Sequence, residues 1–232
     1  MRIRAYIDGY NLFYGALKSG KIKSSIPEDV KQKIKQSKKA VRWLNVEALI
    51  SYYLKGDFSL EAINFYTAEV QALFEGDKSP IRQQEYFKAL SSIENLSIHK
   101  GKFYKHKVSM PLHPVTNPIT FANVIKTEEK GSDVNLASHL VFDACQNNFD
   151  MAVIVTNDSD LLEPIKIVTQ LNKKILILCP HSNICYDFIQ EFTSKVIRKI
   201  DMKALRLSQF DDVIKDDSDN IIATRPTSWQ ED

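Results

Sequence analysis

Apolar residues recur along this chain in two alternating patterns, one typical of buried strands and one of amphipathic helices. Short apolar or alternating runs predict strands at residues 2–8, 60–68, 96–104, 121–127, 151–155, 174–179 and 196–200. Apolar positions at helical spacing predict helices at residues 10–17, 44–53, 80–93, 132–145, 161–171 and 184–192. Such an alternation indicates a central, mostly parallel sheet with helices on both faces. The expected fold class is therefore α/β, as a three-layer α/β/α sandwich.

Two internal segments interrupt this pattern. Residues 18–42 read as a basic insertion between the first two helices. They form either a partly ordered loop or a short helix from Pro27 to Lys38, with proline at the helix start. Residues 108–120 contain three prolines and are predicted to be a loop.

Charge is distributed unevenly along the chain. Residues 18–42 hold nine Lys or Arg against two acids, a net charge of +7, whereas residues 211–232 hold seven acids against two Lys or Arg, a net charge of −5. Periodicity is also lost beyond Phe210, so we expect one domain at 1–205 and a flexible acidic tail at 206–232. A basic segment and an acidic tail in one chain indicate a polyanionic partner, and a tail that competes with this partner for the basic segment. Charge alone is equally consistent with two solvated segments that bind nothing.

Composition favours a globular protein of the cytosol. The 232 residues are 44% hydrophobic and 26% charged, which is ordinary for a soluble domain. No apolar run approaches the roughly 20 residues that a membrane span needs. The N-terminal residues lead directly into a strand, without the apolar region of a signal peptide. The three cysteines, Cys145, Cys179 and Cys185, have no Cys-x-x-Cys spacing, so reduced thiols and a cytoplasmic location are expected.

Four aspartates follow predicted strands or begin predicted helices. Asp8 ends the first strand, Asp133 lies at the start of the helix at 132–145, and Asp158 and Asp160 follow the strand at 151–155. Each of them alone could simply cap a helix, because a first-turn carboxylate satisfies free N–H groups. In open α/β sheets, however, the carboxyl ends of the strands form the edge where ligands bind. If the first strand is central and the 151–155 strand is its neighbour, all four carboxylates meet there.

Carboxylates that meet without a nearby arginine repel one another unless cations lie between them. Oxygen ligands suit Mg²⁺ or Mn²⁺, and such a site can activate water and stabilise the leaving oxygen in phosphodiester cleavage. Asn11 could orient water or a sugar at this site, and Thr156 could bind either an acid or a phosphate. Lys130 and the basic segments would hold the phosphate backbone of a nucleic acid.

A second basic segment interleaves lysines with aromatic rings. Lys100, Lys102 and Lys105 surround Phe103 and Tyr104 near the end of the predicted third strand. Rings beside cations are typical of proteins that bind single-stranded nucleic acid. A strand with a basic solvent-exposed face is an equally good interpretation.

Several other kinds of site lack their motifs. The chain has no G-x-G-x-x-G and no G-K-[ST], which argues against dinucleotide and P-loop sites. It has no G-x-S-x-G nucleophile elbow. Its five histidines show no zinc-ligand spacing. The Asp8 segment lacks the second acid, two residues on, of an aspartyl-phosphate phosphatase.

Three motifs, in this order, resemble the NYN domain of the PIN-like nuclease superfamily, in particular its LabA-like branch. They are Tyr6-Ile-Asp8-Gly-Tyr-Asn11-Leu-Phe, Lys130-Gly-Ser-Asp133-Val and Val155-Thr-Asn-Asp158-Ser-Asp160-Leu. The resemblance covers roughly residues 1–200 and implies a PIN-like α/β/α sandwich with a metal-dependent site that acts mostly on RNA. It assigns metal binding to Asp8, Asp133 and Asp158, support of that site to Asp160, and the polar edge to Asn11. Thr156-Asn157 stands where the family often has Ser-Gly, and the basic insertion and the acidic tail lie outside the family pattern.

The sequence therefore predicts a Mg²⁺- or Mn²⁺-dependent ribonuclease, more an endonuclease than an exonuclease, in which four aspartates, Asp8, Asp133, Asp158 and Asp160, bind metal and Asn11 assists. Single-stranded or structured RNA is the expected partner, with no membrane, and homo-oligomer formation is left open. The first alternative is a catalytically inactive nucleic-acid-binding or regulatory module on the same fold. A weaker one treats Asp158-Ser-Asp160 as the metal-binding motif of a nucleotide-sugar transferase.

Overall fold

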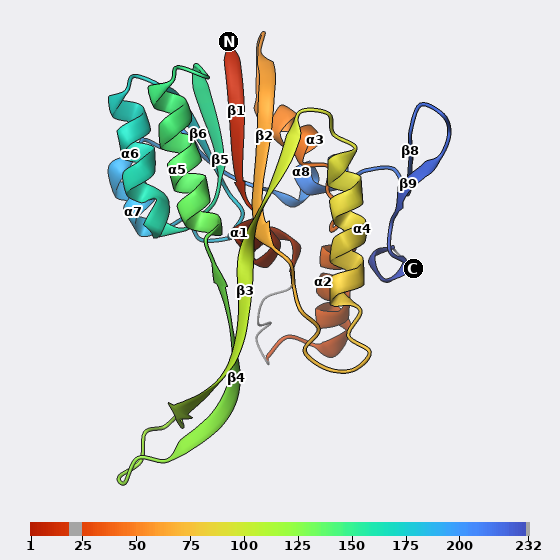
Figure 1. Ribbon diagram of the computed structural model, residues 1–232, viewed down its shortest axis with the longest axis vertical. Coiled ribbons are helices and arrows are strands. Elements are labelled where there is room, and N and C mark those ends of the chain that lie inside the picture. The colour runs from red at the N-terminus through yellow and green to blue at the C-terminus, as the bar shows by residue number, and fades with distance from the viewer. Residues whose placement is uncertain (19–24, 231–232) are drawn as a thin grey trace.

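The computed structural model describes residues 1–18 and 25–230. Within these residues a seven-stranded sheet has the order β4-β3-β2-β1-β5-β6-β7 (Figure 1). The strands are β1 (Arg2–Asp8), β2 (Ser59–Ala68), β3 (Leu96–Pro111), β4 (Phe121–Lys130), β5 (Met151–Val155), β6 (Lys174–Cys179) and β7 (Ile197–Lys199). Neighbouring strands are parallel except β3 and β4. β1 is central and β5 is its neighbour, which is the condition under which the four predicted aspartates meet at one edge.

Helices cover both faces of the sheet, which confirms the α/β/α sandwich (Figure 1). One face carries α5 (Ser132–Cys145), α6 (Leu162–Gln170) and α7 (Tyr186–Glu191). The other carries α1 (Gly9–Leu12), the π-helical turn η1 (Phe13–Leu17), α3 (Val46–Tyr53), α4 (Ser79–Ser91) and α8 (Met202–Leu207). Successive β1 residues point to opposite faces, so Tyr6 packs in the α5 core and Ile7 in the α3–α4 core. No helix in the described residues is long and apolar enough to cross a membrane.

The basic insertion contains a helix, as the second interpretation of its sequence predicted. Helix α2 (Glu28–Ala40) begins directly after Pro27 and has Glu28 and Asp29 in its first turn. Lys38 and Lys39 lie in its last turn, so charges of both signs complement the helix dipole. Lys38 Nζ donates to the Ala16 carbonyl oxygen, which ties the helix to η1. Residues 19–24 of the insertion lie outside the described residues.

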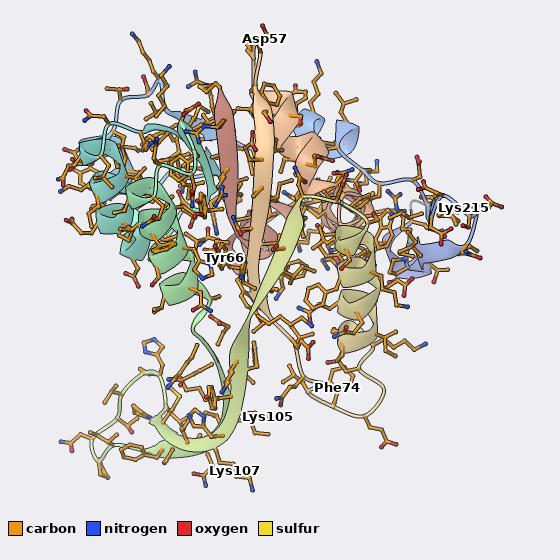
Figure 2. The ribbon with its side chains drawn as sticks, turned by 45° about the horizontal axis from the view of Figure 1, so that its top comes forward. Asp57, Tyr66, Phe74, Lys105, Lys107 and Lys215 are labelled. Carbon is orange, nitrogen blue, oxygen red and sulfur yellow. The ribbon has the colours of Figure 1, made fainter. Side chains whose placement is uncertain are left out.

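Strands β3 and β4 form a long antiparallel ribbon that projects from the sheet (Figures 1 and 2). We call residues 102–130 the arm. The predicted loop at 108–120 is wrong for residues 108–111, which continue β3 and leave the turn to residues 112–120. Pro111 is tolerated because, among the described strands, β3 pairs only with β4 in the arm, so its other edge is free. Since most side chains of the arm are exposed, its sequence lacks the alternation that a half-buried strand would show.

The C-terminal residues fold onto the domain, which differs from the flexible tail predicted for 206–232. After α8 the chain forms a hairpin of β8 (Val213–Lys215) and β9 (Ile221–Thr224) and ends in a 3-10 turn, η3 (Thr227–Trp229). The Trp229 side chain is only 7% exposed and its ring lies 6.3 Å from those of Trp43 and Tyr86. A single buried tryptophan leaves no periodic signal in a sequence. Residues 231–232 lie outside the described part of the chain.

Candidate active site

The carboxyl ends of the central strands bring the predicted acids to one edge of the sheet. β1 and β5 pair in parallel with Ile7 opposite Val155, so the residues that follow each strand lie side by side. α5, whose first turn holds Asp133, packs against β1 and β2. We call the five carboxylates at this edge the acid cluster: Asp8, Glu129, Asp133, Asp158 and Asp160. Asp8 and Asp133 each feel the charge of Asp158, which places these three near one another.

Asp8 is the most buried member of the acid cluster, with 4% of its surface exposed. One carboxylate oxygen accepts a hydrogen bond from the Asn11 backbone N–H at 2.8 Å, and the other accepts one from the Thr156 hydroxyl at 3.2 Å. Asp8 therefore does cap α1, as the capping interpretation predicted. Each Asp8 carboxylate oxygen thus accepts one hydrogen bond, one oxygen as the helix cap and the other from the Thr156 hydroxyl.

The Asp8 carboxyl holds its proton more tightly than an ordinary aspartate. Its pKa is raised to about 7, chiefly by burial and also by the charges of Asp133 and Asp158, although the hydrogen bonds from Asn11 and Thr156 act to lower it. Helix capping alone would lower the pKa of an aspartate, because it favours the charged form. The raised pKa therefore reports a crowded, poorly solvated group of negative charges.

Asp133 is held in place by the turn that joins β4 to α5. Gly131 has a φ of 102°, in the left-handed region that glycine adopts without strain. The Ser132 backbone N–H donates to a Glu129 carboxylate oxygen at 3.1 Å and so anchors the first turn of α5. Burial raises the pKa of Asp133, and the charges of Asp158, Glu129 and Asp160 raise it further.

Glu129 is an acid of this site that the sequence analysis missed. It faces Phe103 across the arm, and its charge acts on both Asp133 and Tyr10. Gly101 leaves room for it, because a Cβ at Gly101 would collide with the Glu129 carboxylate and approach the Lys130 carbonyl oxygen to 2.8 Å. The position of Glu129 three residues before Ser132, where it can cap α5, was the available signal.

Asp158 and Asp160 lie in the turn that follows β5. Asp158 accepts a hydrogen bond from the Asp160 backbone N–H at 3.0 Å, and its own N–H donates to the Thr156 hydroxyl at 3.1 Å. Asp158 is half-buried, whereas Asp160 is exposed. The Thr156 side chain thus joins Asp8 to Asp158, and both acids are held by hydrogen bonds within the edge.

Two asparagines fix the loop that carries Asp158. The Asn11 side-chain oxygen accepts from the Asn157 backbone N–H at 3.0 Å. The Asn157 side chain in turn donates to the Asn183 carbonyl at 3.0 Å and accepts from the Cys185 N–H at 2.7 Å. Asn11 therefore holds the loop in addition to lying at the site. Asn157, which the sequence analysis did not assign, ties that loop to the start of α7.

The acid cluster offers only oxygen donors, which suit Mg²⁺ or Mn²⁺. The pKa values of Asp8 and Asp133 are raised in part by the charge of nearby Asp158, so these three carboxylates carry negative charge that nothing in the described part of the chain balances. A divalent cation would relieve it. In residues 1–18 and 25–230, no group of three or more His, Cys, Asp or Glu side chains is arranged to hold a metal ion. Mg²⁺ needs no such closed group, because it binds through one or two carboxylates and keeps several waters. The residues present therefore fit a hydrated, open cation site.

The predicted nucleic-acid ligands divide between the arm and the interior. Lys100, Lys102 and Lys130 are exposed, and residues 100–104 line an open cleft together with residues 69–71. Lys105 is also exposed, and its Nζ donates to the Ala72 carbonyl at 3.3 Å. Thr156, by contrast, is completely buried, so its assignment as a nucleic-acid ligand is wrong. Of the two roles considered for it, the structure gives the bond to an acid.

Comparison with known proteins agrees with this fold. The NYN domain model matches residues 2–201. The chain is 24% identical over 192 residues to a Pseudomonas putida (strain DSM 28022 / S16) protein named 6-hydroxy-3-succinoylpyridine 3-monooxygenase HspA. This alignment covers 72% of the chain and 55% of HspA, so the chain spans about half the length of that relative. No solved structure matches the chain. Because the NYN model covers most of its residues, the protein belongs to the NYN domain family.

Proposed function

We propose that this protein is a Mg²⁺- or Mn²⁺-dependent ribonuclease of the LabA-like branch that cleaves internal phosphodiester bonds in the cytoplasm. The observation that supports this most strongly is the buried Asp8 carboxyl, whose pKa is raised to about 7 beside two further aspartates. Groups with strongly shifted pKa values at the ligand-binding edge of an α/β sheet are typical of functional sites. Family membership adds independent support, since NYN domains resemble PIN-like nucleases.

Asp8, Asp133 and Asp158 would hold the cation, one or two of them directly and the others through its water molecules. Asp160 would support them from the exposed side of the turn. When bound, the cation supplies positive charge that activates water and stabilises the leaving oxygen. The Thr156 hydroxyl fixes the relative positions of Asp8 and Asp158, because it donates a hydrogen bond to the Asp8 carboxylate and accepts one from the Asp158 backbone N–H. Asn11 fixes the Asp158 loop, so both ends of the site are positioned before substrate arrives.

Two lysines at the base of the arm support the proposal of a polyanionic substrate. Lys102 and Lys130 stand directly opposite each other in the antiparallel pair, on the same face of the arm. Like charges directly opposite each other destabilise a ribbon, and within the described residues only Lys130 of the two lies near a carboxylate, that of Glu128 at 3.8 Å. Phosphates of a bound strand would relieve the remaining repulsion and follow the arm towards the acid cluster.

Two other functions have to be distinguished from this one. An inactive regulatory module would bind RNA with steep salt dependence but without cleavage. The HspA relative carries the name of a monooxygenase, and at 24% identity that activity does not transfer to this chain. The acid cluster favours the nuclease, because hard divalent cations prefer such oxygen ligands.

The purified protein, incubated with labelled single-stranded RNA and Mn²⁺ or Mg²⁺, is expected to cleave it, and EDTA is expected to stop the reaction. Asp158→Asn should lose at least about 100-fold in rate, because several kcal/mol of charge stabilisation depend on the site. The matched control is Asp57→Asn, since Asp57 is an exposed acid at the opposite end of the sheet (Figure 2). A covalently closed RNA circle tests for internal cleavage, and matched DNA tests for the sugar.

Equal activity of Asp158→Asn and Asp57→Asn would contradict the assignment of the site. RNA binding without cleavage in either metal, unchanged by Asp158→Asn, would favour the regulatory module. Cleavage of linear RNA that spares the circle would leave the site in place and make the enzyme an exonuclease.

A further inference from the structure

A row of aromatic rings lies beside the acid cluster and has no part in the site described so far. The Phe103 ring, at the base of the arm, lies 6.3 Å from the Tyr10 ring. The Tyr10 ring is stacked on the Tyr14 ring at 6.3 Å, with 20° between the planes. Lys18 Nζ lies 4.4 Å from the centre of the Tyr14 ring. We call Phe103, Tyr10, Tyr14 and Lys18 the ring track.

The ring track is tied to the acid cluster at its middle. Tyr10 follows Asp8 by two residues, and its hydroxyl donates to the Ala68 carbonyl at 3.0 Å. The charge of Glu129 acts on Tyr10, and Glu129 stands opposite Phe103 in the arm. The hydrogen bond fixes the Tyr10 ring, so the ring track is positioned next to the carboxylates.

One end of the ring track is open to solvent. Tyr14 is 52% exposed, although a tyrosine ring is mostly apolar surface. A tyrosine that served only to cover Tyr10 would gain more from a buried position. Phe103 and Tyr10 are half-buried and support the row, and Tyr14 is its exposed ring, with the flexible Lys18 side chain over it.

Cations continue the ring track in both directions. Lys105 and Lys107 follow Phe103 by two and four residues, so all three lie on the same face of β3. Both lysines are labelled along the arm in Figure 2. Lys18 lies at the other end, over Tyr14. A row of rings with cations at both ends could bind a flexible polyanion that carries flat groups between its negative charges: the rings would stack on the flat groups and the cations would bind the charges. Unpaired nucleotides have this chemistry, whereas the bases of a duplex are stacked on one another and are not available to the rings.

We propose that the ring track binds unpaired bases next to the acid cluster, so that the protein selects single-stranded nucleic acid. A base stacks on Tyr14 in place of the Lys18 ammonium that lies over the ring, and Phe103 and Tyr10 support the Tyr14 ring. The displaced Lys18 ammonium, together with Lys105 and Lys107, binds flanking phosphates. The inference deepens the proposed function and rests on it for the identity of the polymer. Binding can be measured without cleavage, so the two can fail separately.

The test compares three single variants in EDTA, by fluorescence anisotropy with a labelled 12-nucleotide RNA. Tyr14→Leu removes the flat ring and should weaken binding by about 5- to 100-fold, the usual effect of losing one base-stacking ring. Tyr14→Phe keeps the ring and should bind like the parent protein. Tyr52→Leu is the matched control, because Tyr52 is another exposed tyrosine, near the end of α3 and shortly before β2 begins. Equal melting temperatures show that all three fold.

Three further ligands distinguish binding through the bases from binding through the sugar-phosphate backbone. The Tyr14→Leu defect should disappear with duplex RNA and with an oligomer whose central residues are abasic. It should persist with single-stranded DNA, because every base has a flat face whatever its sugar. Unchanged binding of single strands by Tyr14→Leu, or an equal loss on single-stranded, duplex and abasic ligands, would overturn the proposal. If cleavage also fails with every metal while the Tyr14→Leu defect persists, only the nuclease assignment falls.

Discussion

Asp8→Asn is expected to stabilise the metal-free protein by up to about 4 kcal/mol at pH 8 and to have little effect at pH 4. The pKa of Asp8 is raised to about 7 in the folded protein from an ordinary 3.8. Well below pH 3.8 the carboxyl is protonated in both states. As the pH rises to about 7, the unfolded chain loses the proton while the folded protein keeps it, so the folded state loses stability. At 1.36 kcal/mol per pKa unit the full effect is about 4 kcal/mol.

Urea denaturation in EDTA between pH 4 and 8 measures this effect directly. The asparagine side chain keeps an oxygen that accepts from the Asn11 N–H, and it carries no charge. The free energy of unfolding of the Asp8→Asn variant should therefore fall less with rising pH than that of the parent protein. Asp57→Asn should follow the parent curve, because Asp57 is exposed and far from the acid cluster. Parallel curves for the parent protein and Asp8→Asn would show that the acid cluster does not disfavour the Asp8 charge.

Trp229→Ala is expected to lower the free energy of unfolding by about 3–5 kcal/mol, the range measured for truncation of large buried side chains. The Trp229 ring packs on Trp43 and Tyr86, and its removal would leave a cavity between η3 and the helices of that face. Phe74→Ala is the control, since Phe74 is 69% exposed on the loop before α4 (Figure 2). Urea curves that coincide for the two variants would mean that the C-terminal residues are the flexible tail first expected from the sequence.

The sheet and its acidic edge were predictable because their signals are local. β1 and β5 are short apolar runs, and each is followed at once by an aspartate and a helical pattern. Two adjacent parallel strands then necessarily bring Asp8 and Asp158 to one edge. Asp133 was equally visible, because it begins the long amphipathic α5.

Other parts of the molecule depend on contacts between distant residues. Glu129 joins the acid cluster only through its register opposite Phe103 and the space left by Gly101. The arm is exposed on both faces, so no alternation marks where its strands end. The C-terminal residues are held by contacts with distant residues, such as the packing of Trp229 on rings more than 140 residues earlier and the hydrogen bond from the Thr224 N–H to Glu85. None of these contacts produces a periodic pattern in the sequence.

The central claim is that the acid cluster holds a divalent cation, and Mn²⁺ binding by the purified protein at pH 7.5 tests it most directly. Isothermal titration should show one or more Mn²⁺ ions bound by the parent protein and by Asp57→Asn. In Asp8→Asn and Asp158→Asn, the affinity should fall by at least about tenfold, the smaller end of the losses seen when even indirect supports of a metal site are removed. Equal Mn²⁺ affinity in all four proteins would contradict the account, because the cation would then bind away from these carboxylates.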